Sequence, residues 1–264
     1  MTDLAARWFR TYRGTPEPTL RLVCFPHAGG APTAYRSWAG SLPEDIELLA
    51  TCYPGRQDRI GDPFAESVHA MADEIAAALR PLADVPLALF GHSMGSVVAH
   101  EVALRLREEY GISPVRLFVS GSEAPHRRER DEEQPADDAE FLAELRELGH
   151  SSLAAIDDPL LLQLVMPGIR SDYRLSAAYR PTPGAPKHRA PLVAYVGADD
   201  DGCTSEELAA WSEYSHGAFE MRVLPGDHFY LQDQEQQLLA HITGHLQSDL
   251  RLQRVLAAAR RPRP

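Results

Sequence analysis

The stretch "LALFGHSMGSVVAHEVA", residues 87–103, joins an apolar run directly to a helical pattern with no loop between them. Residues 87–90 are typical of a buried strand, and the spacing of apolar residues over 94–110 predicts a helix. Ser93 stands at the corner between the two, inside a G-x-S-x-G sequence. This arrangement is typical of a nucleophile elbow, a strained turn that projects a serine hydroxyl above a sheet.

The two glycines beside the serine support this interpretation. Gly91 and Gly95 leave room for the strand and the helix to approach each other. Ser93 would then lie at a helix N-terminus, where free N–H groups and the helix dipole favour developing negative charge. The alternative is a serine that only caps the helix after a glycine turn. The strand before it and the helix after it favour the elbow.

Strand-like and helix-like segments alternate along the rest of the chain. Strands are predicted over 20–25, 47–53, 87–90, 115–120, 192–196 and 219–224. Helices are predicted over 35–42, 64–82, 94–110, 204–214 and 234–259, and "TSEE" at 204–207 forms a capping box. The alternation predicts the α/β class, with a mostly parallel sheet flanked by helices.

One segment interrupts this alternation. After Gly121 the chain is highly charged and contains proline, two helical patterns follow, and the next strand begins only near Leu192. About 70 residues therefore separate two strands that a minimal crossover would join with far fewer. We expect one domain over 1–264 with a helical lid inserted at about 123–185. The alternative is a set of extra helices packed as ordinary core.

A serine hydroxyl is a poor nucleophile without a base, and in sheets with this elbow the acid and then the histidine follow the serine along the chain. Two late strands end in suitable loops. One continues from Gly197 into Asp199, Asp200 and Asp201, and the last is followed by His228. Asp200 lies three residues after Gly197, the usual offset for the acid, so we predict Asp200 and His228 as the partners.

The other histidines are weaker candidates. His92 lies inside the elbow and cannot reach back to the neighbouring hydroxyl. His69 and His100 lie on helical patterns, where packed or solvated side chains are expected. His241 and His245 are four residues apart on one helix face, as in some metal sites, but the sequence offers no third ligand. We therefore expect a solvated helix face there and predict no metal ligands.

Acyl transfer also needs hydrogen-bond donors for the oxyanion. One donor should be the backbone N–H of Met94, which follows the serine, and the other should come from the loop after an early strand. "LVCFPHAGGA" at 22–31 fits, because Gly29 and Gly30 allow the backbone to approach closely. The alternative is a simple tight turn.

Composition narrows the function further. The net charge of −12 argues against nucleic acid or an anionic membrane as a partner. No run of about 18 apolar residues predicts a membrane span, and the N-terminal residues lack the apolar core of a signal peptide. The three cysteines show no clustered spacing. These features predict a reduced, cytoplasmic protein rather than a disulfide scaffold or a zinc site.

Seven short motifs occur in order over about residues 8–245. They are "FPHAGG" (25–30), "YPGRQDR" (53–59), "GHSMG" (91–95), "LRELGH" (145–150), "IRSDY" (169–173), "GADDDGC" (197–203) and "GDHFYL" (226–231). Together they resemble the stand-alone type II thioesterases of polyketide and non-ribosomal peptide biosynthesis.

The resemblance implies an α/β-hydrolase fold with a helical lid and a triad of Ser93, His228 and Asp200. It implies an oxyanion hole made by the backbone amides of Ala28 and Met94. The implied substrate is an acyl thioester on the phosphopantetheine arm of an acyl or peptidyl carrier protein, and the implied role is editing of stalled or aberrant acyl units. No cofactor of the enzyme's own is implied.

Several points stay open on sequence alone. His150 and Ser151, within 148–158, stand where the family commonly has glycine and threonine. "PLLLQLVM" at 159–166 is either core or the lining of an acyl tunnel. Arg127, Arg128 and Arg130 form either a docking patch or a solvated charged loop. A carboxylester hydrolase or a non-catalytic binding module would have the same fold.

Overall fold

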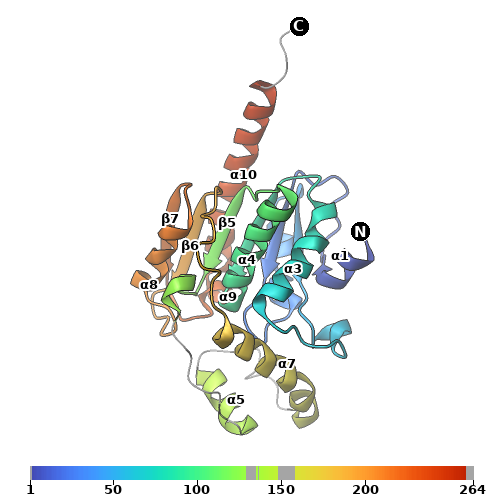
Figure 1. The fold of residues 1–264 in the computed structure, drawn as a ribbon, viewed down its shortest axis with the longest axis vertical. Helices are drawn as coiled ribbons and strands as arrows, with labels where there is room; N and C mark the ends of the chain where they lie inside the picture. Colours follow the sequence, from blue (N-terminus) through green and yellow to red (C-terminus); the bar gives the residue numbers. More distant parts are fainter. Residues whose placement is uncertain (1, 129–134, 136, 148–157, 260–264) are drawn as a thin grey trace.

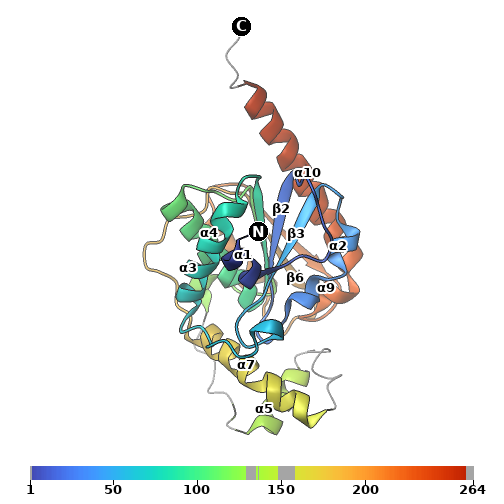
Figure 2. The same cartoon turned by 90° about the vertical axis from the view of Figure 1, so that its right-hand side faces the viewer.

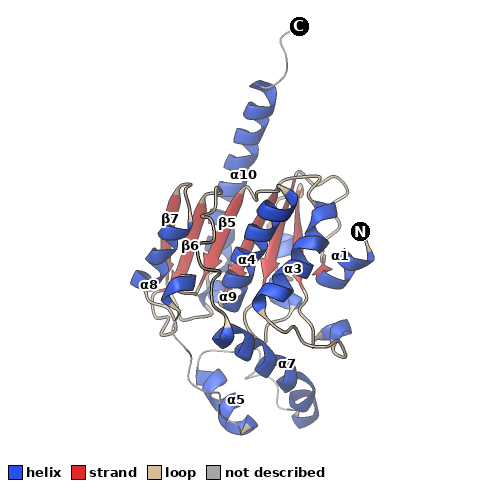
Figure 3. Ribbon diagram, in the orientation of Figure 1, coloured by secondary structure: helices blue, strands red, loops and turns tan. Residues whose placement is uncertain are grey.

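A seven-stranded sheet forms the centre of the molecule, in a computed structural model that describes residues 2–128, 135, 137–147 and 158–259 (Figures 1 and 3). The strands are β1 (Phe9–Arg10), β2 (Leu20–Phe25), β3 (Ile46–Thr51), β4 (Leu87–His92), β5 (Arg116–Ser120), β6 (Leu192–Gly197) and β7 (Phe219–Leu224). Their order is β1-β3-β2-β4-β5-β6-β7, and all neighbours pair in parallel except β1 with β3. The predicted α/β class is confirmed.

Helices cover both faces of the sheet (Figure 2). One layer contains α1 (Asp3–Trp8), α3 (Val68–Leu79), α4 (Met94–Tyr110) and α8 (Ser205–Ala209). The other contains α2 (Trp38–Ser41), α9 (Tyr230–Asp233) and α10 (Glu235–Ala259). Trp8 and Trp211 are buried on the first side and Trp38 on the second. No helix in the described part of the chain is long and apolar enough to cross a membrane.

The central strands are buried along their whole length, which explains why they read as continuous apolar runs. All six predicted strands occur, with ends shifted by at most two residues. The two-residue strand β1 and the short helix α1, capped by the Thr2 hydroxyl, were not predicted. A single helical turn and a strand of two residues are too short to show a period.

Three predicted helices are shorter or divided in the structure. The segment 35–42 is a 3₁₀ turn, Pro32–Tyr35, followed by α2. Helix α3 begins after Ser67, whose hydroxyl accepts from the Ala70 N–H, and 80–82 continues as a 3₁₀ turn containing proline. Segment 204–214 is α8 and a 3₁₀ turn, with the predicted capping box at Thr204 and Glu207 present.

Two further helices, α5 (Asp138–Glu147) and α7 (Pro159–Ala178), lie between β5 and β6 in the sequence. They lie beyond the edge at which the parallel strands end (Figures 1 and 2). Phe141 and Leu145 of α5 pack with Met166 and Ile169 of α7 in a small cluster separate from the two main cores. The lid boundaries stay a prediction, and His150 and Ser151 lie outside the described residues.

Candidate active site

The corner at Ser93 is strained. Its φ of 54° and ψ of −123° are rare for a residue with a side chain. The backbone N–H of Ser93 donates to the carbonyl of Ser120 at 2.8 Å, which holds the corner against the end of β5. The residue is half-buried. Such dihedral angles are typical of a nucleophile elbow, whereas an ordinary N-cap residue has extended, β-region angles.

The glycines beside Ser93 are required by close backbone approach. A Cβ atom on Gly91 would collide with the carbonyl of Gly95, and one on Gly95 would collide with the carbonyl of Phe25. The start of α4 therefore lies directly against the chain as it leaves β2. The two predicted oxyanion donors belong to the segments that meet here, because Met94 directly precedes Gly95 and Ala28 lies in the loop after Phe25.

Asp200 and His228 meet across the ends of β6 and β7. The Nδ1 atom of His228 lies 3.0 Å from each carboxylate oxygen of Asp200, whose side chain is fully buried. The N–H of Gly202 also donates to Asp200, at 2.9 Å. Asp199 and Asp201 are exposed. Of the three aspartates, Asp200 alone contacts the histidine among the described interactions.

The elbow and the histidine loop meet beside Gly121, at the end of β5. The ring centroids of His92 and His228 are 5.0 Å apart, and Ser93 directly follows His92. Gly121 has a φ of 55°, and a Cβ atom there would lie 2.9 Å from His92 and 3.2 Å from His228. Ser93, Asp200 and His228 thus follow the carboxyl ends of β4, β6 and β7, on the same side of the sheet.

Four other histidines are held in structural contacts. His92 is buried, and its Nδ1 atom lies 2.9 Å from the Ser120 hydroxyl. His100 and His188 are buried together, with Nδ1 and Nε2 2.7 Å apart. Burial lowers the pKa of both, that of His188 to about 4. His69 lies 3.2 Å from Glu101. Neither His69 nor His100 is solvated on an open helix face.

The loop after β2 is a tight turn. The N–H of Gly30 donates to the carbonyl of His27 at 2.9 Å, and Gly29 has a φ of 75°. The turn anticipated as an alternative is therefore present. The turn and the predicted oxyanion donor are compatible, because the buried Ala28 lies within this same turn.

A buried ion pair links this turn to the lid. The Asp172 carboxylate on α7 accepts from the Gly29 N–H at 2.8 Å and from the Arg56 guanidinium at 2.7 Å. Arg56 also donates to the carbonyl of Gly30. Burial raises the pKa of Asp172, although Arg56 opposes this shift.

Sequence reasoning did not assign a role to Arg56 or Asp172. Both lie in motifs already quoted, "YPGRQDR" and "IRSDY". The motifs show two charged residues of opposite sign, 116 positions apart. Nothing in the spacing indicates that they pair, because the contact depends on how α7 lies across the sheet.

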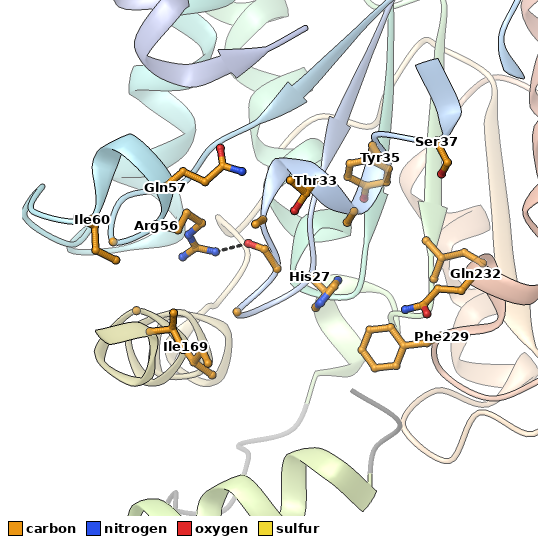
Figure 4. A pocket seen from close by; sticks show the side chains of 18 of the residues that line it. His27, Thr33, Tyr35, Ser37, Arg56, Gln57, Ile60, Ile169, Phe229 and Gln232 are labelled. Carbon is orange, nitrogen blue, oxygen red and sulfur yellow. Dashed lines mark hydrogen bonds between the residues drawn. The ribbon is translucent and has the colours of Figure 1, made fainter. Parts of the chain in front are cut away.

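A cavity of about 790 Å³ opens between this turn, the loop after β3, α7 and α9 (Figure 4). Its wall on α7 is apolar and is formed by Leu161, Leu164, Val165 and Ile169. Met166, in contrast, packs inside the lid. The segment 159–166 therefore supplies both core and cavity wall.

The two described arginines of this set, Arg127 and Arg128, have different surroundings. The Arg128 guanidinium lies 3.2 Å from the Ser122 hydroxyl and 2.9 Å from the Ser176 hydroxyl, so it joins the loop to α7. Arg127 is exposed, and Arg130 lies outside the described residues. The expectation of a wholly solvated loop is wrong at Arg128.

Comparisons with known proteins give matches over most of the chain. The sequence pattern of the thioesterase domain family covers residues 20–246. Thioesterase PikA5 of Streptomyces venezuelae is 38% identical over 240 residues, which are 90% of this chain and 85% of that protein. The type II thioesterase BorB from the borrelidin biosynthetic cluster superposes with a TM-score of 0.85 at 38% identity, covering 93% of this chain and 99% of BorB. YbtT, a type II thioesterase of the yersiniabactin pathway, gives 0.81 at 30% identity, covering 92% and 99%.

Proposed function

Because this chain belongs to the thioesterase family, and within it to the type II thioesterases of polyketide and non-ribosomal peptide biosynthesis, we propose that it edits a megasynthase. It would hydrolyse stalled or aberrant acyl thioesters from the phosphopantetheine arm of acyl or peptidyl carrier protein domains. The pairing of Asp200 with His228, beside the strained corner at Ser93, carries the proposal.

The proposed reaction has two acyl-transfer steps. The Nε2 atom of His228 accepts the proton of the Ser93 hydroxyl while the oxygen attacks the thioester carbonyl. Asp200 accepts from the Nδ1–H and stabilises the imidazolium. The tetrahedral intermediate collapses, the C–S bond breaks, and His228 returns the proton to the departing thiolate. Water, deprotonated by His228, then attacks the acyl-serine ester and releases a carboxylic acid and the serine.

The oxyanion in both steps would accept from the backbone N–H groups of Met94 and Ala28. Known oxyanion-hole donors each contribute roughly 10²–10³ in kcat. The start of α4 lies against the chain leaving β2, which supports a shared position for the two amides. The reaction needs no metal or cofactor of the enzyme, since the phosphopantetheine belongs to the carrier protein.

The acyl group would occupy the cavity beside α7. Leu161, Leu164 and Ile169 offer it apolar contacts, and burial of each methylene contributes about 0.8 kcal/mol. We also propose a cytoplasmic location. Cys24, Cys52 and Cys203 are all free thiols, as expected in a reducing compartment.

The direct test is release of acyl groups from a carrier protein. Carrier protein loaded with acetyl, propionyl, malonyl, hexanoyl or octanoyl groups is incubated with the enzyme, and its mass is followed by intact-protein mass spectrometry. Release by the wild type that is lost in Ser93→Ala supports the proposal. Ser248→Ala is the matched control, because this serine is exposed on α10 and has no proposed chemistry.

Two outcomes would overturn the proposal. Cleavage of small free esters through Ser93 without any release from carrier protein would indicate a carboxylester hydrolase. Binding of acyl-carrier protein without turnover in either assay would indicate a non-catalytic module.

A further inference from the structure

Three metal-ligating side chains meet at a second place, on β7 and α10. The Nε2 atom of His241 lies 3.0 Å from one carboxylate oxygen of Glu220, and the Nε2 atom of His245 lies 3.3 Å from the other. One ligand atom from each residue can be chosen so that all three lie within 4.8 Å of one another. Glu220 is the second residue of β7, whereas His228 follows the opposite end of that strand. The cluster is therefore distinct from the proposed catalytic site.

We propose that Glu220, His241 and His245 bind a divalent transition-metal ion, with Zn²⁺ the best match. Zinc–nitrogen and zinc–oxygen bonds of about 2.0–2.1 Å in a tetrahedron put neighbouring ligand atoms about 3.3 Å apart. The separations of 3.0 and 3.3 Å involve different carboxylate oxygens of Glu220, and rotation of this half-exposed side chain would bring one oxygen within reach of both rings. Two imidazoles and one carboxylate leave the fourth position for water.

The helix supplies the two imidazoles already aligned. Residues four apart lie on the same helix face, and the ring centroids of His241 and His245 are 4.6 Å apart. The sequence shows this pair but not its third member. Glu220 can be recognised as the third ligand only in the folded structure, where β7 is the edge strand of the sheet and α10 packs beside it.

Tyr195 provides the outer support that metal-bound histidines generally have. Its hydroxyl oxygen lies 2.8 Å from the Nδ1 atom of His241. A proton on Nδ1, donated to this oxygen, leaves the Nε2 lone pair directed at the cluster. Tyr195 is fully buried on β6, so it fixes the ring orientation from inside the fold.

The surrounding charges are mixed. Burial lowers the pKa of both histidines, which keeps them in the neutral form that binds metals. The Arg116 guanidinium is neutralised by Asp249, through two contacts of 2.8 Å. Arg222, on the same side of β7 as Glu220, opposes a cation, so its removal should tighten binding.

The bound ion would act as a clamp. It would join the edge strand β7 to the long helix α10, whose C-terminal part extends beyond the sheet (Figure 1). An ion that binds only the folded chain stabilises it by mass action. At a hundredfold excess of free Zn²⁺ over Kd, the expected rise in Tm is roughly 5–10 °C.

The experiment is a titration of EDTA-treated full-length protein with ZnCl₂, with MgCl₂ as the comparison ion. Isothermal calorimetry measures stoichiometry, and Tm is measured at each concentration. We expect one zinc per chain and a rise in Tm, both lost in Glu220→Gln, and tighter binding in Arg222→Gln. His216→Gln is the matched control, because His216 is an exposed histidine outside the cluster.

Cobalt substitution provides a second measurement. Co²⁺ bound by nitrogen and oxygen should give tetrahedral d–d bands without a thiolate charge-transfer band, and His245→Gln should remove them. Absence of saturable Zn²⁺ binding would overturn the proposal. So would binding that survives in Glu220→Gln, or that is lost in His228→Ala instead, which would locate the ion at the proposed catalytic site. Glu220→Gln should leave acyl release in metal-free buffer unchanged.

Discussion

The Asp172 carboxylate on α7 accepts a hydrogen bond from the backbone N–H of Gly29 at 2.8 Å, across 143 residues of sequence. Arg56 contacts the same carboxylate oxygen and also the carbonyl of Gly30. These hydrogen bonds therefore fix the position of the lid helix α7 relative to the turn that contains Ala28. Motion of α7 would also move this turn.

Replacement of Asp172 by asparagine should damage both stability and rate. The buried guanidinium of Arg56 loses its counter-charge, which lowers the free energy of unfolding by about 3 kcal/mol. The displaced turn should lower kcat by about tenfold to a hundredfold. Urea denaturation and single-turnover acyl release measure the two effects.

The control is Asp138→Asn, which removes an exposed partner of Arg170 from the same lid. Its effect on the free energy of unfolding should stay below about 1 kcal/mol. Equal stability of Asp172→Asn and Asp138→Asn would contradict the importance of the buried pair.

Replacement of Asp200 by asparagine should lower kcat by about 10⁴, because the imidazole loses its orienting carboxylate. The exposed neighbours supply the controls, since Asp199→Asn and Asp201→Asn should keep activity within about twofold of wild type. A larger loss in either control than in Asp200→Asn would mean that the acid is wrongly assigned.

Replacement of Gly95 by alanine should prevent folding, because the new methyl group meets the backbone carbonyl of Phe25. Soluble yield and circular dichroism report this directly. The matched helical control is Gly244→Ala in α10, where no atom lies within 4 Å of the added carbon. That substitution should raise the free energy of unfolding by about 0.5–1 kcal/mol. Folded, stable Gly95→Ala would show that the elbow is looser than its backbone indicates.

Stability should fall as the pH drops from 7 to 4. Burial holds the pKa of His188 at about 4, below its unfolded value near 6.5, so the unfolded chain binds the proton first. This residue alone should remove about 3 kcal/mol over that window, after which its contribution levels off. Denaturation of wild type and His188→Gln across the range isolates the effect, and His216→Gln should follow wild type.

Acyl-chain preference should depend on the apolar wall of the cavity. Leu161→Trp should raise KM for octanoyl-carrier protein about tenfold and leave acetyl release unchanged, because added volume excludes only the longer chain. Leu160→Trp is the control, since Leu160 is 75% exposed and does not line the cavity. Equal effects of the two substitutions would mean that the acyl group binds elsewhere.

The sequence predicts those parts of the molecule that depend on local pattern. The strand that ends at His92 and the helix that begins at Met94 show a clear hydrophobic pattern. Loops that follow parallel strands all lie at the carboxyl ends of those strands, on the same side of the sheet. Asp200 and His228 lie in the loops after β6 and β7, which pair side by side, and this placement brings the two side chains together. The one-residue choice among the aspartates is supported by the structure, through burial and contact.

Contacts between distant elements could not be predicted in this way. The pairing of Arg56 with Asp172 depends on where α7 crosses the sheet, and a charged pair leaves no periodic signal. For the same reason, the sequence does not indicate Glu220 as the third member of the cluster with His241 and His245. Glu220 comes from an edge strand whose partner face is set by the packing of α10.

The order of the strands has a consequence for how the enzyme is made. Ser93 follows β4, whereas Asp200 and His228 follow β6 and β7, which pair side by side as the last two strands of the sheet. A nascent chain can therefore form the corner at Ser93 early, but it lacks the proposed base, His228, until β7 has emerged from the ribosome and joined β6. Fragments that terminate before that point contain Ser93 without its proposed partners, so we expect them to release no acyl groups. Translation thus delivers the proposed nucleophile first and the histidine proposed to activate it last.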